Sequence, residues 1–173
     1  VTITDTTSAS NVNIILGATS GNVTAIVTAD TAAALNTALT NATTGTDALT
    51  LTINDTTLTS VSDLLALDGK TNVAVNASSV NSISETIANL NTAYNSAGIS
   101  GLGNENISIT NTGTITAAQI NDLLGETSGT ITLVGSGNLA ITMTSGQTLD
   151  LSGITNSLSG NLSITDSTGN ETI

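Results

Sequence analysis

The residues best suited to chemistry in this sequence are acidic ones that close short alternating stretches. Four such stretches read Val1-Thr2-Ile3-Thr4-Asp5, Leu51-Thr52-Ile53-Asn54-Asp55, Ile107-Ser108-Ile109-Thr110-Asn111 and Leu162-Ser163-Ile164-Thr165-Asp166, and their starts lie 50, 56 and 55 residues apart. Calcium takes about six to eight oxygen ligands from carboxylates and carbonyls. If the stretches stack, Asp5, Asp55 and Asp166 form a ladder of candidate calcium ligands, and Asn111 departs from it. The alternative is a stack of Asx turns that needs no metal.

Other acids add little to this candidate metal site. Asn104-Glu105-Asn106 is a weaker calcium candidate on the same terms. No EF-hand or nonapeptide calcium motif is present in the sequence. Calcium is therefore a cofactor that the sequence allows without requiring it.

The composition excludes most other chemistry. The chain has no Cys and no His, so thiolate and imidazole sites cannot form. Lys70 is the only basic residue and the net charge is -12, which excludes nucleic-acid binding because no basic patch can form. Paired carboxylates do serve glycosidases, but here the acids occupy turn-like positions and no aromatic sugar platform exists. We therefore predict that the chain is not an enzyme.

The elements that must position these acids are short strands. Apolar and polar residues alternate in each of the four stretches, which is typical of a half-buried strand. Thr flanks an apolar residue in Thr2-Ile3-Thr4, Thr130-Ile131-Thr132 and Thr142-Met143-Thr144, so both Thr side chains project from one face. Stacked strands would then array Thr on a grid that resembles ice-binding solenoids. The alternative is that Thr is simply a good solvent-facing strand residue.

Helical patterns lie between the strands. Ile120, Leu123 and Leu124 share one face of a predicted helix over 117–124, and Gly125 is a natural helix stop. A stripe at helical spacing predicts a second helix, capped by Ser82 or Ser84 and with Glu85 in its first turn. The stripe consists of Ile83, Ile87, Leu90, Tyr94 and Ala97.

Recurring landmarks divide the chain into modules. A Leu-Gly landmark recurs as Leu16-Gly17-Ala18-Thr19-Ser20-Gly21, Leu67-Asp68-Gly69-Lys70-Thr71-Asn72 and Leu124-Gly125-Glu126-Thr127-Ser128-Gly129. A second landmark pairs Leu35-Asn36-Thr37-Ala38-Leu39 with Leu90-Asn91-Thr92-Ala93-Tyr94. We predict repeat modules over 1–50, 51–106 and 107–161, the last divergent in its second half, and the first strand of a fourth repeat over 162–173.

The order of elements predicts a β-rich repeat fold. The first two modules read strand, short helix, strand and longer helix, and connections of this length bring successive strands back parallel. We therefore expect an α/β solenoid of parallel strands and short α-helices. Over 131–161 the segments become shorter and resemble either β-helix rungs or a small meander. The alternative fold is a series of β-sandwich modules with inserted helices.

Part of the sequence resembles a known repeat. The pieces are Leu67-Asp68-Gly69-Lys70-Thr71, Val75-Asn76-Ala77-Ser78-Ser79-Val80 and the run from Leu90 to Glu105. They look like the tandem Thr/Asn/Gly-rich repeat of very large bacterial cell-surface proteins, notably marine ones. The match extends over about 51–106, is partial over 1–50 and 107–130, and fades beyond. The resemblance implies an extracellular array for structure, adhesion or surface coating, and it carries over no catalytic residues.

These observations predict a structural protein that acts by assembly. We expect a non-enzymatic repeat segment of an extracellular surface or filament-forming protein, cut from a longer chain, whose partner is itself. The alternatives are a calcium-dependent adhesin or surface-lattice module and, third, an ice-binding protein. The apolar runs are only a few residues long, as in Ile14-Ile15-Leu16, so we expect no membrane insertion.

Overall fold

The protein is a mixed α/β structure with parallel sheets. The computed structural model describes residues 1–43 and 45–166, except for the side chain of Asp166. In this part of the chain there are five short helices, and every strand pair is parallel. The chain divides into two compact units. The first takes residues 1–56, 60–80 and 96–102, and the second takes the described residues of 57–59, 81–95 and 103–166.

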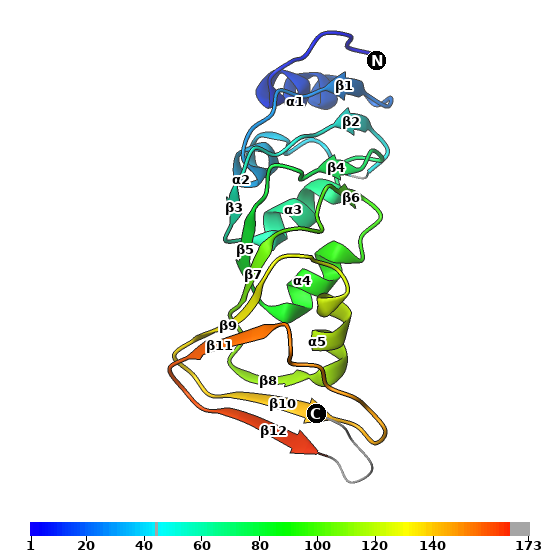
Figure 1. The fold of residues 1–173 in the computed structure, drawn as a ribbon. Coiled ribbons are helices and arrows are strands. Elements are labelled where there is room, and N and C mark those ends of the chain that lie inside the picture. Colours follow the sequence, from blue (N-terminus) through cyan, green and yellow to red (C-terminus); the bar gives the residue numbers. More distant parts are fainter. Residues whose placement is uncertain (44, 167–173) are drawn as a thin grey trace. The chain divides into compact units, whose positions relative to one another are not determined.

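The first unit combines three helices with very short strands (Figure 1). Its elements are α1 (Ala9–Ala18), β1 (Thr24–Ile26), α2 (Ala32–Ala38), β2 (Ala48–Thr50), α3 (Val61–Asp68), β4 (Val75–Asn76) and β6 (Ile99–Ser100). Thr24 pairs with Ala48, and Val75 pairs with Ile99, in each case 24 residues further on. Parallel bridges at Thr2–Thr24, Asp30–Ile53 and Thr52–Asn76 extend this pairing. We call each such stretch, from one paired position to its partner, a pass of the chain.

The core of the first unit follows from alternation along each pass. Apolar side chains at every second position turn inward, as the pleat of a strand requires. The helices bury one face each against them. The buried residues are Val23, Ala25, Val27, Leu49, Leu51, Ile53, Val75 and Ala77 from the strand segments, and Val12, Leu16, Ala32, Leu35, Val61, Leu64 and Leu67 from the helices.

The second unit has longer strands and two helices (Figure 1). Its elements are β3 (Thr57–Leu58), β5 (Ser82–Glu85), α4 (Ile87–Tyr94), β7 (Asn106–Ile109), β8 (Gly113–Thr116), α5 (Ala117–Leu124), β9 (Ile131–Gly135), β10 (Leu139–Met143), β11 (Ile154–Leu158) and β12 (Leu162–Asp166). One sheet has the order β11-β9-β7-β5-β3, and another has the order β12-β10-β8. Ile107 pairs with Ile131, and Ile131 with Ile154, so the passes are again about 24 residues long.

The helices begin where their first amides find acceptors. Thr31 Oγ1 accepts a hydrogen bond from the Ala34 N–H at the start of α2. Thr116 and Gln119 form a reciprocal capping box at the start of α5. Such caps satisfy amides that the helix itself leaves unpaired. The helix predicted over 117–124 is confirmed with these bounds.

One helix start was predicted wrongly. Ser82–Glu85 is the strand β5, and α4 begins only at Ile87 after Thr86. Ile83 is buried, as the helical stripe required, but Ser-Ile-Ser also alternates. Pairing of β5 with β3 and β7 on both sides decides in favour of the strand.

The pairing also bears on the last part of the chain. β9 pairs in parallel with β11, and β10 pairs in parallel with β12. A meander would join antiparallel neighbours, so these parallel strands do not form one, and the β-helix-like arrangement of 131–161 stays a prediction. The rest of the predicted fourth repeat, residues 167–173, lies outside the described residues.

Candidate functional site

At two of the four predicted strands, the closing Asp or Asn caps a helix in the preceding pass. Asp55 Oδ2 accepts a hydrogen bond of 2.7 Å from the N–H of Ala32, the first residue of α2. Asn111 Oδ1 accepts one of 2.6 Å from the N–H of Ile87, the first residue of α4. The first amides of a helix have no partner within the helix, so these oxygens satisfy them. At both positions the Asx residue therefore has a structural role.

The other two acids of the predicted calcium ladder are placed differently. Asp5 is exposed, and its carbonyl oxygen accepts from Thr7 Oγ1 at 3.0 Å. Residues 2–7 pair with β1, and β1 pairs with β2, so the pass that contains β1 lies between Asp5 and Asp55. Two strand spacings therefore separate the backbones of these two acids, which is roughly 10 Å. Asp166 ends β12 in the second unit, where its backbone pairs with Met143.

No metal cluster of acidic or imidazole groups supports this ladder. Among the side chains that the structure describes, no three His, Cys, Asp or Glu residues gather closely enough to hold a metal ion. The side chain of Asp166 is outside that set. Calcium binding by Asp5, Asp55 and Asp166 stays a prediction.

Glu105, the acid of the weaker calcium candidate, is a fully buried structural carboxylate. Its Oε2 accepts hydrogen bonds from Tyr94 Oη at 2.7 Å, from the Gly103 N–H at 2.8 Å and from the Asn104 N–H at 3.1 Å. Burial and, next, the hydrogen bond to the Glu105 carboxylate raise the pKa of Tyr94 above its ordinary value. Donors surround the carboxylate, so it closes a turn rather than offering oxygens to a cation.

The Thr of each Leu-Gly landmark forms the turn that follows a helix. Thr19, Thr71 and Thr127 each accept, through Oγ1, the N–H two residues further on, at 3.0–3.1 Å. Two of them also reach the preceding pass: Thr71 Oγ1 donates to the Leu49 carbonyl at 2.8 Å, and Thr127 Oγ1 donates to the Glu105 carbonyl at 2.8 Å. At Thr71 and Thr127 the landmark thus marks a buried turn that bonds to the preceding pass, whereas the turn at Thr19 is more exposed.

The Asn of the second landmark joins neighbouring helices within each unit. In the first unit Asn36 Nδ2 donates to Asp63 Oδ1 at 2.9 Å, which links α2 to α3. In the second unit Asn91 Nδ2 donates to the Gln119 carbonyl at 3.1 Å, which links α4 to α5. Both copies of this landmark therefore link two neighbouring helices within their own unit.

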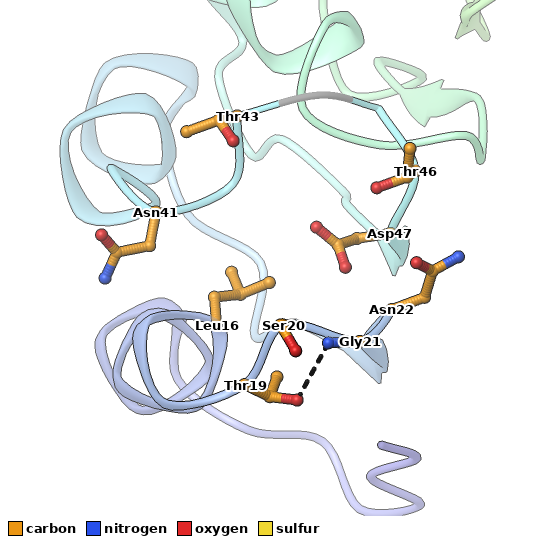
Figure 2. A pocket seen from close by; sticks show the side chains of 9 residues that line it. All are labelled: Leu16, Thr19, Ser20, Gly21, Asn22, Asn41, Thr43, Thr46 and Asp47. Carbon is orange, nitrogen blue, oxygen red and sulfur yellow. Dashed lines mark hydrogen bonds between the residues drawn. The ribbon is translucent and has the colours of Figure 1, made fainter.

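A polar pocket of about 140 Å³ lies in the first unit, between the segments that follow α1 and α2. Figure 2 shows the Asp47 carboxylate directed into the space between Ser20 and Thr46. Asp47 is 7% exposed, and its Oδ1 accepts from the Val23 N–H at 2.7 Å. The nine lining residues are Leu16, Thr19, Ser20, Gly21, Asn22, Asn41, Thr43, Thr46 and Asp47. With oxygen-bearing side chains and no basic residue, this lining suits a cation or a neutral polar group rather than an anion.

Sequence reasoning did not single out Asp47. The usable signal was its distance from other landmarks: Val23, Asp47 and Thr71 are spaced by 24 residues, the length of one pass. The hydrogen bonds follow that spacing, because Thr71 Oγ1 also donates to the Asp47 carbonyl.

Comparison with known proteins assigns no relationship. No protein-family model, curated protein or solved structure matches the chain significantly. Within the described residues, no helix has both the length and the apolar character needed to cross a membrane.

Proposed function

We propose that this chain is a structural repeat segment of an extracellular surface or filament-forming protein, which acts by stacking passes of chain on one another. In this proposal the passes form an α/β solenoid that becomes β-helix-like over 131–161. The observation that carries it is the parallel register at about 24 residues, which recurs in both units. A β-sandwich would instead pair its strands mainly in antiparallel fashion.

Side-chain contacts between passes support the same proposal. Helix caps from Asp55 and Asn111, turn bonds from Thr71 and Thr127, and helix links from Asn36 and Asn91 all join a residue to a neighbouring pass. A unit that gains its bonds from the next unit gains stability by repetition. None of these contacts needs a bound substrate.

The outer strands of the second unit favour addition of further strands. Among the described residues, β12 lies at the end of its sheet, and Leu162 and Ile164 are half-buried. Because the Leu139 N–H donates to the Asn161 carbonyl, residues 161, 163 and 165 face β10, and the amides of Leu162 and Ile164 face the other edge. Unpaired edge amides are a template for another strand. We therefore expect a second copy of the chain as the partner.

Self-association tests this proposal. We expect the purified chain to form concentration-dependent assemblies in sedimentation velocity and in electron microscopy. Ile164→Pro removes an edge amide without removing a bond to β10, so it should suppress assembly while the circular dichroism of the monomer is kept. The matched control Ile164→Val keeps the amide and should assemble as the parent does. A parent chain that stays monomeric at all concentrations would falsify self-association.

A further inference from the structure

We propose that the pocket at Asp47 is a calcium site, formed by one buried carboxylate and a surround of neutral oxygens. The site is distinct from Asp5, Asp55 and Asp166. It lies in the first unit, between the segment 19–22 after α1 and the described residues of 41–43 and 45–47 after α2. It does not depend on stacking, so it stands whether or not the chain self-associates.

The first argument is the charge of Asp47. Its side chain is more than nine-tenths buried, and Val23 N–H is the one donor that its carboxylate has among the described residues. That bond uses Oδ1, and the carboxylate as a whole is directed into the pocket (Figure 2). A largely buried carboxylate that lines a polar pocket without basic side chains attracts a cation.

The second argument is that no side chain of the protein supplies that cation. Lys70 is the only basic side chain in the sequence. Its Nζ donates to the Leu39 carbonyl at 2.9 Å, and Lys70 is not among the residues that line the pocket. With a net charge of -12, the chain attracts cations from solution.

The third argument is the set of polar side chains that line the pocket with Asp47. Hydroxyl and amide side chains of Thr19, Ser20, Asn22 and Thr43 line the pocket together with Asp47. These are hard oxygen donors, which select calcium, magnesium or sodium over transition metals. Thr19 Oγ1 accepts from the Gly21 N–H, and this bond fixes the segment that presents Ser20.

Calcium fits this set better than magnesium. Calcium accepts many neutral oxygens in irregular geometry, whereas magnesium demands a near-octahedral shell at short distances. The irregular lining, drawn from two connecting segments, favours the more tolerant ion. With a single carboxylate, the expected affinity is that of extracellular modules, a Kd of about 10⁻⁴–10⁻³ M.

Calcium titration of the chelator-treated protein tests the site. Isothermal titration calorimetry should give one site in this range of Kd. At calcium ten times above Kd the folded-to-unfolded ratio should rise about tenfold, because only the folded state binds. Asp47→Asn keeps an oxygen for Val23 N–H but loses the charge, so it should weaken binding about tenfold or more. Ser20→Ala keeps the charge and should weaken binding by a smaller factor.

The matched control is Asp122→Asn. Asp122 is exposed on α5 in the second unit, so this variant has the same net charge as Asp47→Asn and should bind calcium as the parent does. The proposal is overturned if the parent shows no calcium-dependent stabilisation, if magnesium binds as tightly as calcium, or if Asp47→Asn and Asp122→Asn behave alike. If Asp47→Asn fails to fold, an unchanged Kd in Ser20→Ala would overturn it.

Discussion

In the first unit the paired strands β1, β2, β4 and β6 are only two or three residues long, whereas β9, β10, β11 and β12 of the second unit have five residues each. A strand pair of two residues supplies few backbone hydrogen bonds. The first unit compensates with side chains: Thr71 Oγ1 alone bonds to the N–H and carbonyl of Leu49 and to the Asp47 carbonyl. Backbone bonds thus join the passes in both units, with side-chain bonds added beside the short strands of the first unit and longer backbone ladders in the second.

The comparison teaches what a repeat needs when it lacks aromatic residues. Tyr94 is the one aromatic side chain, and the buried apolar side chains described in both units are Val, Ile, Leu and Ala, together with Met143. Small apolar residues fill the space between passes without large anchors. Register must then come from polar contacts, either on side chains or along the backbone.

The largest expected effect tests whether the two cores are equally tight. Leu64 on α3 and Leu133 on β9 are both fully buried. Leu64→Ala and Leu133→Ala should each lower the free energy of unfolding by about 2–5 kcal/mol, since each leaves a cavity. Urea denaturation of both variants measures this. A loss confined to one variant would show that only one unit depends on close apolar packing.

The next effect should separate the two regions. Thr71→Val in the first unit removes a buried hydroxyl and leaves its backbone partners unpaired, so we expect a loss of about 1–3 kcal/mol. The matched variant Thr132→Val lies half-buried on β9, whose backbone is paired on both sides, and should change stability by less than about 0.5 kcal/mol. Equal losses in urea denaturation would contradict the division between side-chain and backbone contacts.

Much of the local structure was readable from pattern. The stretch Leu162–Asp166 is a strand with the predicted bounds, and the parallel direction follows from the length of the connections. Ser82–Glu85 was misread because Ile83 satisfies a helical stripe and a strand alternation at once. Only the pairing of this segment with neighbouring strands distinguishes a strand from a helix here. The sequence of the segment alone does not show that pairing.

The repeat spacing was readable only in part. Copies of the opening stretch lie 50 to 56 residues apart, but the strands pair every 24 residues or so, and one predicted module holds about two passes. Asp55 and Asn111 were recognised as recurrent, yet their cap acts on a helix one pass back. Asp47 belongs to none of the recurring landmarks, so the repeat spacing of 50 to 56 residues could not reveal it.

A smaller effect distinguishes capping from calcium at the recurrent Asx. Asp55→Ala should cost about 0.5–2 kcal/mol, because it leaves the Ala32 amide without its acceptor. Asp55→Asn keeps a side-chain oxygen and should stay close to the parent. Thermal melting of both variants, with and without chelator, measures the difference. If Asp55→Asn loses as much as Asp55→Ala, and only in the presence of calcium, Asp55 is a ligand rather than a cap.

The smallest effect concerns Glu105, the buried carboxylate of the second unit. The first unit also has a buried carboxylate, that of Asp47. Tyr94 is half-buried and donates to Glu105, so folding raises the pKa of its phenol above the unfolded value of about 10. A raised pKa favours the neutral phenol in the folded state. Its contribution to stability is complete below pH 10 or so and falls as the pH rises further, because the unfolded chain then releases the proton first.

Alkaline denaturation of the parent and Tyr94→Phe tests this contact. The free energy of unfolding should fall more steeply above pH 10 in the parent than in Tyr94→Phe, while other groups contribute equally to both. Because Tyr94 is the sole tyrosine and the chain has no Trp, its ultraviolet absorbance reports the ionisation directly. Parallel stability profiles, or a phenol that titrates at its ordinary pKa in the folded protein, would mean that the bond to Glu105 does not hold this turn. The second unit would then rely on its backbone ladders even where a side-chain contact is buried.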